Sequence, residues 1–82
     1  MKKHEITENI IAIISEIFKI TKDEVTLEST FESLGADSLD SAEVIMKIEM
    51  DFNIEINNSK IKTLDSVSAL ADFVEIALNE KK

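Results

Sequence analysis

The serine at position 38 is the residue whose type and setting best fit chemistry. It follows Asp37 and lies three residues after Gly35, the only glycine in the sequence. A glycine permits a tight backbone turn, so a new helix can begin near Ser38 and bring its hydroxyl to the surface. The Ser38 hydroxyl would then lie beside unpaired backbone N–H groups and the positive end of the helix dipole. Negative charge at this position would therefore be stabilised.

Two other roles compete for Ser38. An aspartate–serine pair before a helix is usually an N-cap and nothing more, and this interpretation stays open. A hydrolytic nucleophile would need a positioned base, but the only histidine, His4, falls in a first helical turn that should fray. Ser38 also lacks the Gly-x-Ser-x-Gly pattern of a hydrolase elbow. The sequence thus disfavours a serine hydrolase.

The chain is strongly acidic, with 17 carboxylates against nine lysines and a net charge of -8 over 82 residues. This balance argues against nucleic acid and anionic membranes as partners and favours basic proteins. The acids gather around Ser38, because the stretch 32–55 holds seven carboxylates and one cation, Lys47. No apolar run approaches the ~18 residues of a membrane span or matches a signal peptide, so we expect a cytoplasmic protein without membrane insertion.

Composition favours helices within a single domain over residues 1–82. One glycine and no proline leave little turn chemistry for a sheet, and without cysteine the core alone must stabilise the fold. Apolar spacing and capping residues predict three long helices, over residues 4–19, 38–53 and 66–79, and a short one holding Ile61 and Leu64. In the connection 20–37, capping-box patterns that start at Thr21 and Ser29 predict short helical turns. The expected fold is all-α, a small four-helix bundle with a short third helix and a long first loop.

Apolar residues occupy two opposite sides of the helix predicted over residues 38–53. The side expected in the core consists of Val44, Ile45, Ile48 and Phe52. The other side consists of Leu39, Ala42, Met46 and Met50, flanked by Glu43 and Glu49. A helix buried on both sides is the alternative, but a chain this small cannot easily cover both. We therefore expect an exposed apolar strip edged by carboxylates, suited to transient partners.

Residues 34–40, Leu-Gly-Ala-Asp-Ser-Leu-Asp, resemble the attachment motif of the acyl carrier proteins. The resemblance extends over nearly the whole chain, through Glu43, Met46, the segment 52–56 and the stretch 69–73. It implies a carrier that is not itself an enzyme, with an arm of 4'-phosphopantetheine moved from coenzyme A to Ser38 by a transferase. The thiol of that arm would hold growing acyl chains as thioesters for the enzymes of fatty acid synthesis. A monomer is expected.

The resemblance also implies roles for individual residues. Asp37 and Leu39 would flank the attached cofactor, and Asp37 and Asp40 would help the transferase recognise the site. The surface that binds partner enzymes would comprise Asp40, Ala42, Glu43, Met46 and Glu49. An apolar cleft for the acyl chain would be lined by Val44, Ile48, Ile56, Ile61, Leu64 and Phe73. Each role has a plainer alternative, since the aspartates could complement the helix dipole, the glutamates could be solvated positions and the cleft residues could be core. No metal site is implied.

Other functions and some departures from the family pattern remain open at this point. The chain could serve a specialised pathway of polyketide, lipid A-type or aminoacyl transfer, or be a plain acidic helical adaptor without an arm. The aromatic residue that the family often has eight residues before the serine is replaced by Thr30, with Phe31 next to it. Lys47 puts a cation on an acidic helix, and residues 57–62 lack the usual proline and acids. These departures affect residues that would pack the first loop and form the third helix.

Overall fold

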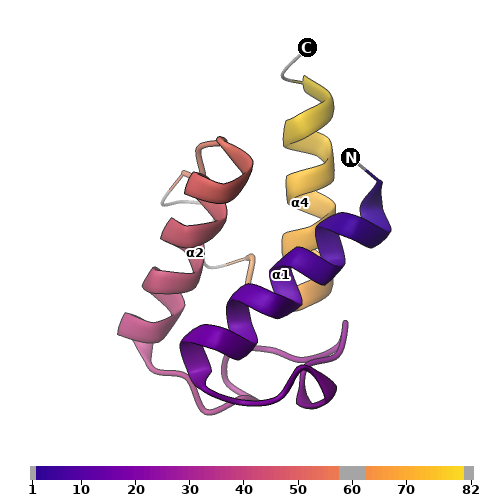
Figure 1. The fold of residues 1–82 in the computed structure, drawn as a ribbon. Helices are drawn as coiled ribbons and strands as arrows, with labels where there is room; N and C mark the ends of the chain where they lie inside the picture. The colour runs from indigo at the N-terminus through magenta and orange to yellow at the C-terminus, as the bar shows by residue number, and fades with distance from the viewer. Residues whose placement is uncertain (1, 58–62, 81–82) are drawn as a thin grey trace.

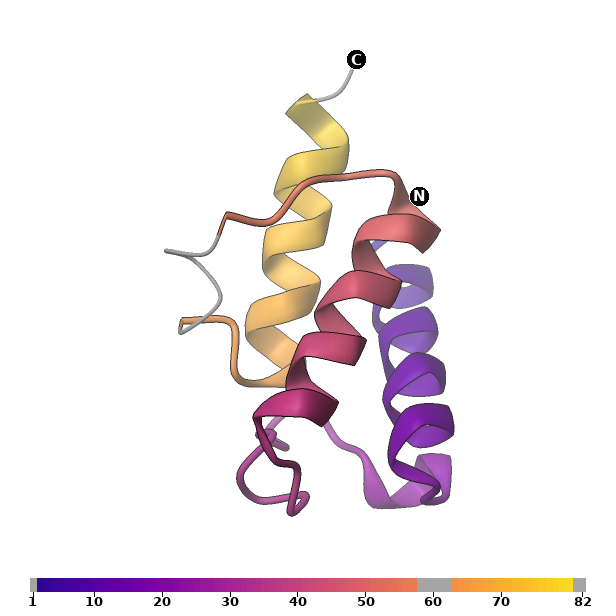
Figure 2. The same ribbon diagram turned by 90° about the vertical axis from the view of Figure 1, so that its left-hand side faces the viewer.

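A computed structural model describes residues 2–57 and 63–80, and for Ser38 it describes the backbone alone. Its helices are α1 (Lys3–Phe18), the short 3-10 helix η1 (Lys22–Glu24), α2 (Ser38–Phe52) and α4 (Val67–Glu80). Helix α1 packs against both α4 and α2. Figures 1 and 2 show the three long helices side by side, with the segment that joins α1 to α2 passing under one end of the bundle. The predicted all-α architecture is therefore confirmed.

The periodicity of α1 explains its place at the centre of the bundle. Ile6, Ile10, Ile13 and Ile14 recur at helical spacing and are all buried. The helix ends at Lys19, which adopts the left-handed conformation with φ 58° and donates its backbone N–H to the Ser15 carbonyl. The predicted helix over 4–19 agrees with the observed one to within one residue at each end.

Helix α2 also agrees closely with the expected range. It begins after Asp37, whose side chain caps the first turn, and it ends at Asn53, in the left-handed conformation with φ 55°. Asparagine tolerates that conformation better than most residues, which explains why the helix stops there without a glycine. The four residues assigned to the core side of this helix are all buried: Val44, Ile45, Ile48 and Phe52.

Helix α4 supplies the third wall of the core. The Ser66 hydroxyl accepts the Ala69 N–H at 3.2 Å, so Ser66 caps the start of this helix. The buried residues of α4 are Val67, Leu70, Ala71 and Val74. Ala77 and Leu78, which the periodicity also places on this stripe, are only partly buried because they lie near the end of the helix.

The long first loop is held against the start of α4 by backbone hydrogen bonds. Phe31 N–H donates to the Asp65 carbonyl at 2.9 Å, and Val67 N–H donates to the Ser29 carbonyl at 3.1 Å. The Phe31 side chain is buried, and its ring meets the Phe18 ring edge-on with centroids 6.2 Å apart. The aromatic displaced by one position from the family pattern thus packs the loop onto α1. The connection is therefore ordered by contacts with α1 and with the start of α4.

The two capping boxes predicted in this loop are wrong in detail. At Thr21 the helical turn exists as η1, but no side-chain hydrogen bond caps it. At the second site Thr30 and Ser33 cap each other: Thr30 N–H donates to Ser33 Oγ and Ser33 N–H donates to Thr30 Oγ1, both at 2.9 Å. The Ser29 hydroxyl instead accepts the Thr26 N–H at 2.9 Å, so it is not available to the turn that follows.

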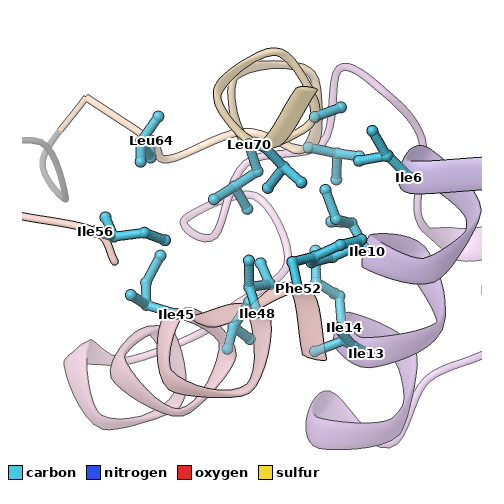
Figure 3. Packing of buried hydrophobic residues seen from close by; sticks show 14 of the residues in the cluster. Ile6, Ile10, Ile13, Ile14, Ile45, Ile48, Phe52, Ile56, Leu64 and Leu70 are labelled. Atoms are coloured by element: carbon cyan, nitrogen blue, oxygen red, sulfur yellow. The ribbon is translucent and has the colours of Figure 1, made fainter. Parts of the chain in front are cut away.

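The helices and loops share one hydrophobic core, part of which Figure 3 presents in close-up. The core contains residues of α1, α2, α4 and the connecting segments, and Ile6, Ile10, Ile14, Ile48 and Leu70 are fully buried in it. The short third helix predicted around Ile61 falls in residues 58–62, outside the described residues. Leu64, expected in the same helix, is described and belongs to the core.

Candidate functional site

Ser38 is the first residue of α2, where a tight turn brings the chain out of the loop. Gly35 has φ +78°, and an added Cβ would meet nothing within 4 Å, so the backbone conformation rather than crowding requires glycine here. The turn is closed by Gly35 N–H to the Glu32 carbonyl at 3.0 Å and Ala36 N–H to the Phe31 carbonyl at 2.9 Å. Because Phe31 is anchored in the core, this turn fixes where α2 begins.

Asp37 takes the N-cap role that the sequence left open between it and Ser38. Its Oδ1 accepts the Asp40 N–H at 2.9 Å, and its carbonyl accepts the Ser41 N–H and hydroxyl, both at 3.1 Å. The cap therefore places Ser38 at the first helical position, directly after the capping residue. Asp37 and Leu39 on either side of Ser38 are exposed, Leu39 by 68%.

The start of α2 suits a covalently attached phosphodiester. A helix begins with backbone N–H groups that have no partner inside the helix, and Asp37 occupies only that of Asp40. The N–H groups of the first turn and the helix dipole favour negative charge at this end. The exposed neighbours of Ser38 leave room for a modifying enzyme to approach. These residues fit an anionic cofactor.

The outward side of α2 carries the exposed apolar strip that the sequence predicts. Leu39 is 68% exposed, Met46 59% and Met50 73%, and Ala42 is exposed as well. Glu43 is exposed beside them, and no ion pair to it occurs within residues 2–57 and 63–80. Asp40 is half-buried at the first turn. The interpretation of α2 as a helix buried on both sides is therefore wrong.

Glu49, at the edge of this strip, also organises the end of α2. Its carboxylate accepts the Ile56 N–H at 2.8 Å in a partly buried hydrogen bond. Its backbone carbonyl accepts the N–H groups of Asn53 and Ile54. Sequence reasoning missed this internal role, because the partner amide is seven residues away and no local motif indicates it. The contact of Glu49 with partner enzymes remains a prediction.

Four of the six residues expected to line an acyl cleft lie in the core. Val44 and Ile48 are completely buried, and Ile56 and Leu64 are nearly so. Figure 3 shows Ile56 and Leu64 on the side of Ile45 and Ile48 that faces away from α1. Phe73 is half-buried and lines an open pocket of about 570 Å³, together with Ile54 and Ala77 among others. Ile61 lies outside the described residues. The cleft itself remains a prediction.

A second hollow, between α1 and α2, was not foreseen from the sequence. It has a volume of about 300 Å³ and is lined by Glu16, Ile17, Glu43, Met46, Lys47 and Met50. The spacing of its α2 residues could have indicated a stripe, but the sequence alone does not say which part of α1 faces it. Within the described part of the chain, acidic and histidine side chains form no cluster that could hold a metal ion.

Comparison with known proteins identifies the family of the chain. Residues 8–74 match the family model described as the phosphopantetheine attachment site. An acyl carrier protein of Cyanidium caldarium is 38% identical over 80 residues, covering 96% of this chain and 93% of that protein. One of Azobacteroides pseudotrichonymphae is 41% identical over 78 residues, with 93% and 92% covered.

The fold gives the same answer as the sequence comparisons. The structure of an acyl carrier protein from Enterococcus faecalis superposes with a TM-score of 0.79 at 28% identity, covering 94% of this chain and 99% of that one. Family match, relatives and fold therefore coincide over nearly the same residues, and the chain belongs to the acyl carrier protein family, whose cofactor is phosphopantetheine.

Proposed function

We propose that this chain carries growing fatty acyl groups as thioesters on a 4'-phosphopantetheine arm attached to Ser38, and that it catalyses no reaction itself. The observation that carries the proposal is the position of Ser38 at the start of α2, directly after the Asp37 cap, inside the segment that matches the attachment family. The bound arm supplies a thiol that forms and releases the thioester. The chain's own residues present, orient and protect this group.

Attachment is a substitution at phosphorus in which the Ser38 hydroxyl is the nucleophile. A new bond forms between its oxygen and the phosphate that bears the pantetheine of coenzyme A. The bond to the adenosine-bearing phosphate breaks, and the serine proton is lost. The chain has one histidine, His4, which is exposed in the first turn of α1 and paired with Glu8. The base for this step is therefore assigned to the transferase, not to the carrier.

The outward side of α2 is the proposed recognition surface for the transferase and for the synthesis enzymes. Its members are Asp40, Ala42, Glu43, Met46 and Glu49, with Asp37 and Leu39 at the end that bears Ser38. Exposed apolar side chains supply contact area, and carboxylates attract basic patches over a Debye length of roughly 8–10 Å. Rim charges of this kind raise association rates more than they prolong complexes. Brief, salt-sensitive contacts suit a carrier that must leave each enzyme.

The core beside α2 is the proposed shelter for the acyl chain. Each methylene removed from water contributes about 0.8 kcal/mol of favourable free energy. Burial of a long acyl chain can therefore offset the cost of locally rearranging packed side chains. Ile56 and Leu64 lie on connecting segments rather than in the long helices, so they can separate from Ile48 and Val44 with little disruption of helix packing. Ile61 and Phe73 would extend the lining.

Intact mass measures the attachment directly. The chain is incubated with coenzyme A and a broad-specificity phosphopantetheinyl transferase, together with Ser38→Ala and Ser41→Ala. Ser41 belongs to the same first turn of α2, so it is a matched control. The wild type and Ser41→Ala should gain one phosphopantetheine, and Ser38→Ala should gain none. An unmodified wild type would support the adaptor alternative, and a modified Ser38→Ala would move the site elsewhere.

The cargo and the compartment need separate measurements. Thioester-bound groups released from protein purified from its native cell should be straight fatty acyl chains; polyketide or aminoacyl groups would overturn the fatty acid assignment.

No helix within the described residues is long and apolar enough to cross a membrane. We place the chain in the cytoplasm as a monomer, on the support of its acidic surface, and expect cell fractionation and light scattering to agree.

A further inference from the structure

We propose that Met46 and Met50 form a reversible oxidation site for hydrogen peroxide, and that their oxidation weakens the contact of modifying enzymes with α2 without unfolding the chain. The two residues belong to the exposed apolar strip of α2 and lie one helical turn apart. The inference rests on the proposed function only in taking this strip as a surface that those enzymes contact. It adds a chemical modification that regulates the surface.

Methionine is the main redox-sensitive residue of this chain. The sequence contains no cysteine, tryptophan or tyrosine, and its three methionines are at positions 1, 46 and 50. The methionine thioether is oxidised to a sulfoxide, and enzymes can reduce the sulfoxide again. Two of the three thioethers therefore lie on one face of one helix, and it is the face that the proposed function uses.

Both side chains are accessible to a small oxidant. Met46 is 59% exposed and Met50 73%, whereas Ile48 between them is fully buried. They also line the hollow of about 300 Å³ between α1 and α2, a volume far above the roughly 30 Å³ that one water molecule occupies in the liquid. Hydrogen peroxide is only slightly larger than water, so it reaches both methionines without any opening of the fold.

The charges around the two methionines favour a neutral oxidant. Glu16 and Glu43 are exposed and line the same hollow, and the whole chain has a net charge of -8. Lys47 lines it too, but it lies 3.7 Å from Asp51 of the same helix. This surface repels an anionic oxidant such as persulfate, whereas hydrogen peroxide has no net charge. The hollow therefore admits peroxide in preference to anions.

The oxidation balances with peroxide as the only co-reactant. A lone pair of the thioether sulfur attacks one peroxide oxygen, so a sulfur–oxygen bond forms and the oxygen–oxygen bond breaks. The second oxygen leaves as water, because it takes up the proton of the transferred oxygen. The sulfur is oxidised and the peroxide is reduced. The return step belongs to methionine sulfoxide reductases, of which one type acts on each sulfoxide epimer.

Oxidation changes the surface of α2 and leaves the core intact. A sulfoxide oxygen accepts hydrogen bonds from water, so burying it against an apolar side chain of an enzyme has a cost that the thioether lacks. Because both methionines are exposed, the fold loses no buried contact when they are oxidised. We expect the oxidised protein to keep its melting temperature and to be modified at Ser38 several-fold more slowly.

Peptide-resolved mass spectrometry tests the site itself. In hydrogen peroxide both Met46 and Met50 should gain one oxygen atom, and Met50 should react faster because it is more exposed. Ile48→Met is the matched control, because it places a methionine at a fully buried position of the same helix with a similar side-chain volume. The methionine introduced there should resist oxidation. Treatment with both types of sulfoxide reductase should restore the original mass.

The rate of phosphopantetheine attachment tests the consequence. Peroxide is removed before coenzyme A and the transferase are added, so the enzyme is not oxidised. Oxidised wild type should be modified several-fold more slowly than untreated protein, and reductase treatment should restore the rate. The double variant Met46→Leu, Met50→Leu keeps Met1 and should be insensitive to peroxide. Each protein is compared with itself before and after treatment, so differences in basal rate cancel, and thermal unfolding verifies the fold.

Several results would overturn this proposal. The site is wrong if Met46 and Met50 gain no oxygen, or if the methionine introduced at position 48 is oxidised as fast as they are. The regulation is wrong if oxidised wild type is modified as fast as untreated protein, if the double leucine variant slows equally, or if oxidation unfolds the chain. An untreated wild type that accepts no phosphopantetheine contradicts the proposed function instead, and this is seen before any peroxide is added.

Discussion

The two sides of α2 are both apolar, but one side is buried in the core and the other is exposed. Ile48 is fully buried, whereas Met50, two residues later, is 73% exposed. Hydrophobicity does not separate them, because both are large apolar side chains on the same helix. The difference is that α1 and the connecting segments cover the inner side and nothing in the described chain covers the outer strip. An apolar strip that a fold leaves uncovered, with carboxylates at its edge, indicates a partner site.

The largest expected difference between the two sides is in stability. Ile48→Ala removes a fully buried side chain and should lower the free energy of unfolding by about 2–5 kcal/mol. Met50→Ala removes an exposed one and should change it by less than about 0.5 kcal/mol. Urea unfolding monitored by circular dichroism measures both. Similar losses would mean that the outer strip is covered in solution, for example by self-association.

Glu49 lies between the buried and the exposed side of α2. Removal of its side chain should have the next largest effect on the free energy of unfolding. Glu49→Ala leaves the nearly buried Ile56 amide without its acceptor, at a cost of about 1–3 kcal/mol. Glu49→Gln keeps a carbonyl oxygen that can accept this hydrogen bond, so it should cost much less. Hydrogen exchange at the Ile56 amide should accelerate in the alanine variant. If the glutamine variant lost as much stability, the charge rather than the hydrogen bond would be responsible.

The outer side should respond in rate rather than in stability. Glu43→Lys reverses an exposed carboxylate and should slow modification of Ser38 several-fold, with little change in unfolding. Glu28→Lys makes an equal change in net charge in the exposed first loop and is the matched control. Initial rates at low and at high salt provide the measurement, and salt should reduce the difference. An unchanged rate for Glu43→Lys would remove this position from the recognition surface.

The smallest expected effect concerns the α1–α4 contact that helps enclose the inner side. The hydrogen bond and charge of Asp72 raise the pKa of Lys3 above its ordinary value of 10.5, and Glu75 adds to this. Because the pKa of Lys3 is higher in the folded protein than in the unfolded chain, its protonation stabilises the fold at any pH below the unfolded-state pKa. This stabilisation is lost as the pH rises through the pKa of the folded protein. Lys3→Gln should therefore lower Tm slightly near neutral pH. The difference from wild type should vanish well above pH 10.5; a difference that persists there would point to packing of the lysine stem instead.

Much of the site could be predicted because it depends on short-range rules. Gly35, Asp37 and the apolar spacing after them indicate a turn, a cap and a helix that begins at Ser38, and the structure has these elements in that order. Hydroxyl and amide groups compete for partners within a few residues, and at Ser66 the hydroxyl accepts the N–H of Ala69, three residues later. The same competition misled the expectation at Ser29, whose hydroxyl bonds backwards to Thr26 rather than forwards.

The rest depends on contacts between residues far apart in the sequence. The packing of Phe31 on Phe18 and its backbone hydrogen bond to Asp65 could not be inferred from the loop alone. The hydrogen bond from Ile56 to Glu49 needs the chain to fold back after α2, which no periodicity encodes. The α1–α2 hollow depends on the relative rotation of two helices.

By itself the sequence determined the bounds of the long helices to within one residue, which side of α2 enters the core, and that Ser38 lies at a helix start amid concentrated negative charge. Helix spacing, capping and charge are local properties, so they can be read residue by residue. Only the tertiary structure decided that Glu49 turns inward, that Phe31 anchors the first loop, and that Glu16 and Ile17 face Met46 and Met50. Those outcomes depend on which surfaces meet when the helices pack, and packing is a property of the whole chain.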